Sequence, residues 1–329
     1  MDAPPSAVLH FSLCQQIFLS YFRGCSIVFS MVARLMRLSF ILPVCFLITS
    51  VTVSAQSVLL KYDLPTGLAL KYKQVEQTSA LAQSNDGRST EIDRQVTRYF
   101  TITAENTTAD AITYIAVQDT AIVDENSEDP RIQRQNRLMQ NLLTRKPVQV
   151  RQSTEGRVEA TQPLKPLEAE KLLGPGATDA IFAQRAAILP VLPDRPIALG
   201  MSWKDSRADT LQPNKTLPQF GKGRGIRYLA GSTEYTVAGE ETVDGTECWW
   251  IRWESITTME EQILFDRLEE YTEDETISTG EMYIAKENAL PVKVDVTTSR
   301  ESMRAVFGAQ TSVIPTSVST KTTLERISQ

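Results

Sequence analysis

Histidine and cysteine are scarce in this 329-residue chain. It has one histidine, His10, and four cysteines, of which Cys14, Cys25 and Cys45 precede residue 56 and only Cys248 follows it. A segment without histidine holds no Ser-His-Asp triad, Cys-His pair or histidine-ligated zinc. One cysteine forms no cysteine zinc site, redox pair or internal disulfide. We also find no nucleophile elbow, P-loop or dinucleotide fingerprint, so we predict no catalytic residues, metal or cofactor beyond residue 56.

Basic residues are not in excess. The formal net charge is -6, so we expect no non-specific binding to nucleic acid. With 42% hydrophobic and 22% charged residues, the composition is that of an ordinary globular protein.

Residues 31–55 have the three parts of a secretory signal peptide. Arg34 and Arg37 precede an uncharged apolar run, 38–53, and small residues lead to a predicted cleavage between Ala55 and Gln56. The alternative is a retained membrane anchor, because the run falls only slightly short of the roughly 20 residues that span a bilayer. We interpret 1–30 as an extension from a start codon assigned too far upstream, and an unusually long n-region is the alternative. The mature chain is then exported to the periplasm or cell surface and has no transmembrane span.

Alternating apolar and polar residues predict antiparallel strands over most of the mature chain. For example, Val96, Phe100 and Ile102 fall on one face of such a strand, with Arg94 and Arg98 among their polar neighbours. The strands look long, and each has one apolar face, which favours a large curved sheet over a small sandwich. We predict a mainly β (α+β) fold whose antiparallel sheet is half-barrel or barrel-like.

Helix signals gather in the middle of the chain. Asp129 and Pro130 predict one helix start, residues 167–173 before Gly174 predict a second helix, and Thr178 predicts the start of a third. We therefore expect two or three helices inserted into the β-rich domain. The expected organisation is a domain over 56–329 with two β-rich halves, 57–161 and 197–328, joined by a helical segment, 162–195.

A tryptophan-rich segment is the first candidate binding site. On a strand, Trp249 and Trp253 share one face and Trp250 lies on the other. One hypothesis is an aromatic wall in an apolar ligand cavity, and the other is a core strand filled with bulky side chains. In the second case Cys248 is a small buried hydrophobe rather than a nucleophile.

A basic, glycine-rich segment, 221–227, is the second candidate. Lys222, Arg224 and Arg227 are interleaved with three glycines, so we predict a loop. Such a loop can cradle an anion with backbone N–H groups and cations, or it can be a plain flexible connector.

Residues 254–275 are rich in Asp and Glu. A carboxylate pair for glycoside chemistry or a calcium site is one hypothesis, and solvated hairpin edges are the other. Likewise Arg131, Arg134 and Arg137 form a stripe on the first predicted helix, which fits an anionic partner or a solvated helix face.

The chain resembles an uncharacterised family of exported bacterial proteins, known only as a domain of unknown function. The resemblance lies in Pro193, Pro196 and the Gly200-Met201-Ser202-Trp203 junction, and in the later Asp244-Gly245 turn. It implies a two-half, β-rich architecture and supplies no catalytic residues. The long strands with interposed helices are also distantly similar to the Lol-type lipoprotein carriers, half-barrels that hold acyl chains. Fold alone does not fix function.

Three functions follow as hypotheses. The first is an exported, non-enzymatic binding protein of the bacterial cell envelope that holds a lipid or another apolar or amphipathic ligand, with Trp249, Trp250 and Trp253 as wall residues. The second is a structural or protein-interaction module that binds an envelope protein. The third is a histidine-free hydrolase that depends on carboxylates.

Overall fold

A computed structural model describes residues 57–83, 89–127, 129–174, 177–217, 221–308 and 311–327, with 214–217 described by their backbone alone. The chain divides into two units, Met1–Ser54 and Ala55–Gln329, and all described residues belong to the second. The predicted extension, the signal peptide and the cleavage between Ala55 and Gln56 lie outside the described residues. Among the helices that are described, none is long and apolar enough to cross a membrane.

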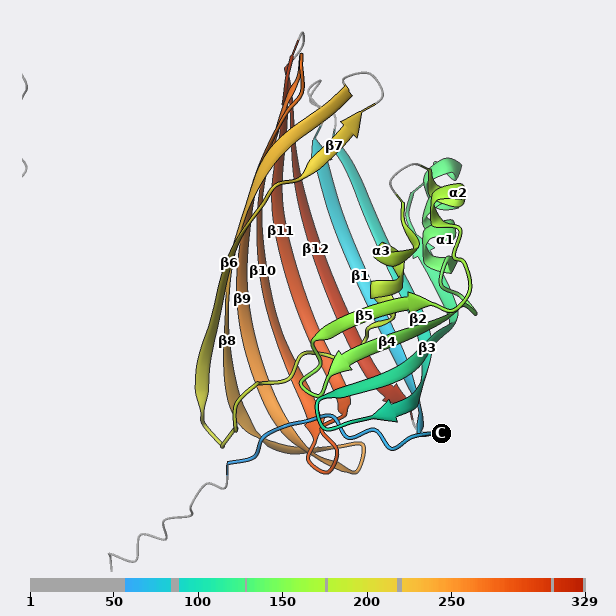
Figure 1. The fold of residues 1–329 in the computed structure, drawn as a ribbon, viewed down its shortest axis with the longest axis vertical. Helices are drawn as coiled ribbons and strands as arrows, with labels where there is room; N and C mark the ends of the chain where they lie inside the picture. Colours follow the sequence, from blue (N-terminus) through green and yellow to red (C-terminus); the bar gives the residue numbers. More distant parts are fainter. Residues whose placement is uncertain are drawn as a thin grey trace, which may run out of the picture. The chain divides into compact units, whose positions relative to one another are not determined.

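One 12-stranded sheet dominates the described residues (Figure 1). Its strands are β1 (Ala69–Gln83), β2 (Ser89–Thr107), β3 (Ala111–Glu125), β4 (Pro147–Ser153), β5 (Val158–Pro163), β6 (Ser202–Leu211), β7 (Asn214–Leu217), β8 (Gly221–Val243), β9 (Thr246–Leu264), β10 (Glu269–Ala285), β11 (Pro291–Phe307) and β12 (Ser312–Ile327). The ladders that join them are antiparallel. The predicted mainly β fold with a large antiparallel sheet is confirmed.

The strand order explains where the helices lie. The order is β5-β4-β3-β2-β1-β12-β11-β10-β9-β8-β6, with β7 also paired to β8. The connection from β5 to β6 therefore runs between the two edges of the sheet. It carries α2 (Ala169–Leu173), α3 (Asp179–Ala183) and the 3-10 turn η2 (Gln184–Ala186). Among the described strands no ladder joins β5 to β6, so the sheet is open at this point.

The first and third helices begin where the sequence predicts, and the second begins at Ala169, two residues after its predicted start. Asp129 caps α1 (Pro130–Asn141) by accepting a hydrogen bond from the Arg131 N–H, and Thr178 caps α3 in the same way. Gly174 follows α2 with a positive φ of 94°, a backbone conformation that suits glycine. The sequence pattern predicts that the third helix runs to Leu189, but α3 ends at Ala183 because the chain tightens into η2 there.

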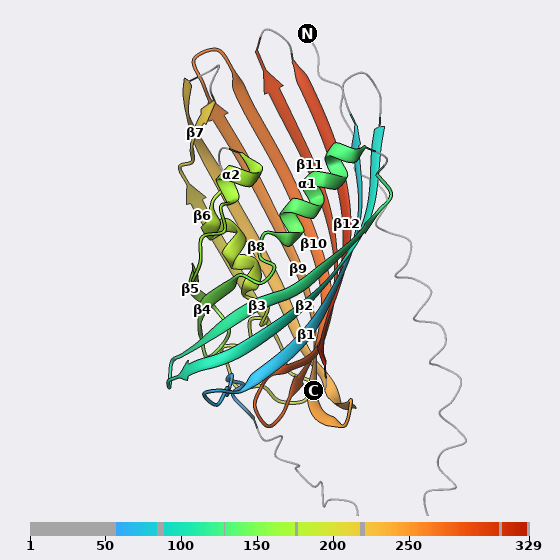
Figure 2. The ribbon, with the colours of Figure 1, turned by 90° about the vertical axis from the view of Figure 1, so that its right-hand side faces the viewer.

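All three helices lie over one face of the sheet, which we call the inner face (Figures 1 and 2). Alternate residues of each strand point to this face. At one end of the strands they form a core with the helices and the segment 57–68. Large, fully buried members of this core are Leu60, Tyr62, Leu64, Tyr72, Phe100, Ile102, Ile112, Tyr114, Leu167, Ile197 and Ile251. Each such side chain contributes about 1.5–3 kcal/mol by leaving water.

Along β9 the inner face changes from apolar to polar. Ile251 is buried in the core, Trp253 is half-buried at its margin, and Ser255 and Thr257 follow. Farther on, Glu261 pairs with Arg227 of β8. The opposite, outer face is mostly polar and exposed. The large core lies at one end of the inner face, and Ile263 and Phe265 are buried near the other end, beyond Glu261.

The β4–β5 turn packs closely against Tyr62 and Pro190 and is hydrogen-bonded through Gln152. Gly156 in this turn has a φ of 87°. Gln152 donates a 2.8 Å hydrogen bond to the Gly156 carbonyl and accepts one of 2.8 Å from the Tyr114 hydroxyl. The Tyr62 hydroxyl donates to the Pro190 carbonyl at 2.6 Å. Burial raises the pKa of both tyrosines, so their hydroxyls stay protonated donors.

Candidate functional site

A polar pocket of about 410 Å³ lies between the inner face of β1–β3, helix α1 and residues 184–188. This volume falls in the range of small-ligand sites, roughly 300–1,000 Å³. Its lining combines charged side chains, four glutamines and an apolar wall. The lining residues are Gln74, Glu76, Arg94, Arg98, Gln118, Met139, Gln140, Leu143, Gln184, Arg185, Ala187 and Ile188.

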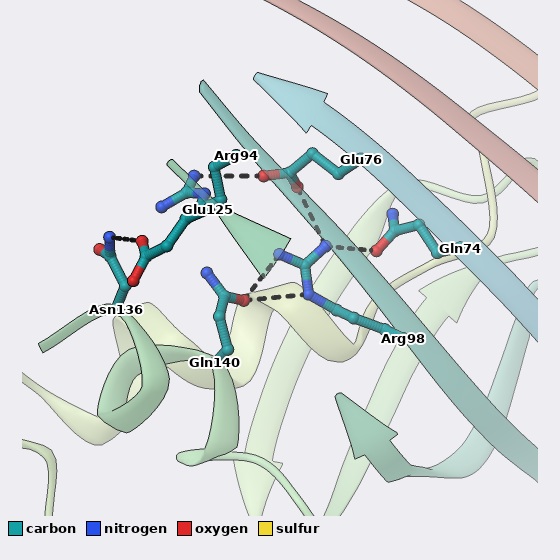
Figure 3. A network of polar contacts seen from close by, with 7 residues as sticks. All are labelled: Gln74, Glu76, Arg94, Arg98, Glu125, Asn136 and Gln140. Carbon is teal, nitrogen blue, oxygen red and sulfur yellow. Dashed lines mark hydrogen bonds and ion pairs between the residues drawn. The ribbon is translucent and has the colours of Figure 1, made fainter. Parts of the chain in front are cut away.

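Arg98 is the central charge of this pocket and is only 8% exposed. It points from β2 toward α1 (Figure 3), where Gln140 Oε1 accepts from its Nε at 3.1 Å and its Nη2 at 2.7 Å. Its Nη1 donates to Gln74 Oε1 at 2.9 Å and to Glu76 Oε2 at 3.0 Å. A buried guanidinium is stable only with such partners, so these contacts fix its orientation.

Glu76 bridges two arginines. Its carboxylate lies 3.0 Å from Arg98 Nη1 and 3.5 Å from Arg94 Nη2. Beside it, Glu125 accepts a 2.5 Å hydrogen bond from Asn136 on α1. The Arg94 Nε and the Glu125 Oε1 are buried and have no hydrogen-bond partner among the described residues. Both atoms are closed to solvent, so neither of them is offered to a ligand in the pocket, which the rest of the Arg94 side chain lines.

Arg185 brings a third guanidinium to the pocket from η2. Its charge lies 5.0 Å from the centre of the Phe182 ring, a cation–π contact. No hydrogen bond or ion pair joins it to another residue that the structure describes. Burial, and then repulsion from Arg98, lower the pKa of Arg185, while Glu76 acts in the opposite direction. The pocket thus concentrates positive charge.

Helix α1 is tied to the sheet under this network. Gln118 of β3 is 3% exposed, and its Nε2 donates to the Gln140 carbonyl at 2.7 Å and to Thr144 Oγ1 at 2.8 Å. The N-terminal cap by Asp129 fixes the other end of the helix. Both anchors keep Gln140 opposite Arg98, so the pocket is preorganised.

One feature of the sequence does point to this pocket: two arginines occupy inward positions of strand β2. We expected Arg94 and Arg98 to lie beside the apolar face of β2, and this prediction is wrong. They lie on that face, in step with Val96 and Phe100, which are 0% and 1% exposed. An arginine at an inward position of a strand needs a buried partner. The positions of Arg94 and Arg98 in the alternation of β2 therefore indicate a buried polar site.

The three candidate tryptophans lie on both faces of β9. Trp249 is 7% exposed and Trp253 is half-buried, and both pack on the inner face. Gly280 lies opposite Trp253, and a Cβ there would be 2.6 Å from the indole ring. Trp250 is on the outer face, stacked on Tyr283 at 6.2 Å. None of the three lines the arginine pocket, and their role as ligand walls stays a prediction.

The basic segment 221–227 begins strand β8 and is not the loop that we predicted. Gly223 and Gly225 are needed for packing, because a Cβ would come within 2.5 Å of the Phe265 ring and of the Gln262 carbonyl respectively. Arg227 is on the inner face and pairs with Glu261. Lys222 and Arg224 are exposed, and alternation places them on the other side of the strand. The three cations do not converge, and anion binding by this segment remains untested.

Acidic residues of β9 and β10 form cross-strand ion pairs on the inner face. Glu270 pairs with Arg304 at 2.8 Å, Asp274 pairs with Arg300, and Glu261 with Arg227 as described. Within the described ranges, no group of three or more His, Cys, Asp or Glu residues could hold a metal ion. Each of these carboxylates has a guanidinium partner, as expected of structural charges in a sheet.

Cys248 is buried on the outer side of β9, and burial raises the pKa of its thiol. The reactive thiolate is therefore disfavoured. We expect iodoacetamide to modify Cys248 roughly a hundredfold more slowly in the native protein than in denaturant. Peptide mapping by mass spectrometry measures this site separately from other cysteines. Equal rates in both conditions would contradict the burial.

Comparison with known proteins does not assign a family. No protein-family model matches this chain, and no curated protein matches it. The resemblance to an exported family of unknown function therefore stays a prediction. The two-half organisation that this resemblance implies also stays a prediction.

Solved structures similar to this chain include three bacterial proteins. OccK5 of Pseudomonas aeruginosa is 7% identical over 80% of this chain and 100% of that chain, with a TM-score of 0.31. OmpF of Salmonella typhi in complex with daunomycin is 5% identical over 78% and 98%, with a TM-score of 0.22. An outer membrane channel of Pseudomonas putida is 5% identical over 81% and 98%, with a TM-score of 0.17. Likeness this distant says nothing about what the chain does.

Proposed function

We propose that the chain is an exported, non-enzymatic binding protein of the cell envelope that holds an amphipathic ligand on the inner face of its sheet. The arginine pocket carries the proposal. It is a 410 Å³ space that opens beside a folded core. Its polar wall comes from β1–β3 and its apolar wall from α1 and residues 187–188. This pairing suits a molecule with one polar and one apolar end.

The apolar part of the ligand has a surface to contact beyond the pocket lining. On the inner face of β1, Ala80 pairs with Ile92 of β2 and with Val318 of β12. These three side chains are only partly buried. They lie past the row that contains Arg94 and Thr78, on the same face. A short apolar tail from the pocket would find its contacts there.

Filling the pocket tests this function. We expect decanoate or its neutral amide, decanamide, to bind the full-length protein saturably in isothermal titration calorimetry. The variant Ala187→Trp places a large ring in the pocket and should abolish this binding. The matched control, Ile181→Trp, changes a residue of α3 that is 57% exposed and should bind as the unmodified protein does. Unchanged binding by Ala187→Trp, or no binding of either probe, would refute the proposal.

A second candidate function rests on the sheet edge. Strand β6 is an edge strand whose residues after Trp203 are all exposed. An unpaired edge can accept a strand from a partner protein, as an envelope interaction module requires. However, Lys204, Asp205, Arg207 and Asp209 lie along this edge, and charges of this kind commonly discourage strand addition. We therefore favour the ligand-binding function.

A further inference from the structure

The charges around the pocket do not balance. Arg94, Arg98 and Arg185 line it together with a single carboxylate, that of Glu76. Glu125, beside Arg94 in Figure 3, is the next acidic group in the network. Counting both carboxylates leaves the cluster with one positive charge in excess. Positive charge gathered in a partly buried site costs free energy unless an anion offsets it.

The guanidinium groups differ in how many of their donors are in use. Arg98 is held on both sides by Gln140, Gln74 and Glu76. Arg94 has its contact to Glu76 through Nη2, and its Nε is buried without a partner. Arg185 is exposed, and among the described residues its guanidinium contacts only the Phe182 ring. The free donors therefore belong to Arg94 and Arg185, while Arg98 is a structural charge.

We propose that this pocket recognises its ligand by a head group that carries one negative charge, a carboxylate, held by the guanidinium groups of Arg185 and Arg94 that line the pocket. This inference rests on the proposed function and names the class of its ligand. A single negative charge balances the excess on the cluster. Guanidinium groups bind carboxylates through paired, charge-assisted hydrogen bonds.

The structure already contains one contact of this kind. The Glu76 carboxylate sits between Arg94 and Arg98, within 3.5 Å of each. An incoming carboxylate would meet the accessible part of the Arg94 side chain, which is 21% exposed, and Arg185, which lines the same pocket. The side chains of Met139, Leu143 and Ile188 line the same space and would contact the first carbons of the tail. The chemistry of the lining thus matches an amphipathic anion from head to tail.

Head-group charge is tested with two probes of the same shape. Decanoate and decanamide have the same chain and planar heads, and only the first is charged at neutral pH. We expect isothermal titration calorimetry on the full-length protein to show about tenfold tighter binding, or more, for decanoate. In Arg185→Gln this preference should fall to nearly equal affinities, with the decanamide affinity retained. In the control Arg134→Gln, on the exposed side of α1, the preference should persist.

The outcomes separate this inference from the function on which it rests. If both probes bind equally to the unmodified protein, recognition by charge is wrong, although the binding function stands. If Arg185→Gln keeps the full preference, the assignment to Arg185 is wrong. If neither probe binds, the proposed function itself fails. Circular dichroism of each variant establishes that the sheet is intact.

Discussion

Replacing Gly156 with alanine is expected to lower the free energy of unfolding by about 4 kcal/mol. The residue has a φ of 87°, a conformation that costs side-chain-bearing residues about 1–3 kcal/mol. The new Cβ would also lie 2.3 Å from the Pro190 carbonyl oxygen and 2.9 Å from the Tyr62 ring. Overpacking of this kind costs about 1–3 kcal/mol more. Urea unfolding followed by circular dichroism measures the loss as a lower midpoint.

Gly67 offers a matched control for this change. Its φ is 84°, and a Cβ there would have no neighbour within 4 Å. Gly67→Ala therefore adds the backbone strain without the clash, and we expect it to cost about 1 kcal/mol. Equal losses at the two positions would show that the junction around Tyr62 and Pro190 can relax.

The second large effect is expected at Arg98. Arg98→Ala removes the group that pairs with Glu76 and Gln140, and it leaves Gln140 buried and Glu76 partly buried. Removing one partner of a buried pair costs about 3–5 kcal/mol. Because Arg94 still contacts Glu76, we expect the lower end, about 3 kcal/mol. Urea unfolding again measures the change.

Two further variants give this experiment its control. Arg134→Ala alters an exposed arginine of α1 and should change stability by no more than about 0.5 kcal/mol. The variant Arg98→Met keeps the Glu76–Arg94 ion pair and restores much of the lost side-chain volume, so it isolates the contribution of the guanidinium charge and its hydrogen bonds. Recovery of the unmodified protein's stability in Arg98→Met would mean that the loss in Arg98→Ala comes from packing.

Local patterns in the sequence predict much of this fold. Period-two alternation indicates the long strands, and the caps at Asp129 and Thr178 indicate where α1 and α3 begin. A glycine-rich segment is harder to interpret, because glycine occurs both in loops and at closely packed strand positions. Residues 221–227 are an example, since they form a strand rather than the predicted loop. Their glycines make room for Phe265 and Gln262, and nothing in the segment itself reveals those neighbours.

The candidate site is less accessible to sequence reasoning, because its residues are brought together by tertiary structure. Gln140 is 42 positions from Arg98, and Arg185 reaches the pocket from the connection between the two sheet edges. No local spacing relates these residues. The only local clue is the inward position of Arg98 between Val96 and Phe100, and it indicates a buried partner without naming it.

The pairing of β1 with β12 has a consequence for synthesis of the protein. The other neighbours in the sheet lie close in sequence, but this ladder joins Lys71 to Ile327 and Ala82 to Thr316. A nascent chain on the ribosome can form hairpins on either side of the junction as they emerge. The two groups of strands cannot be hydrogen-bonded to each other until β12 is free to insert between β1 and β11. Completion of the sheet must therefore wait for the last of its described strands, and closing so long a loop makes that step slow.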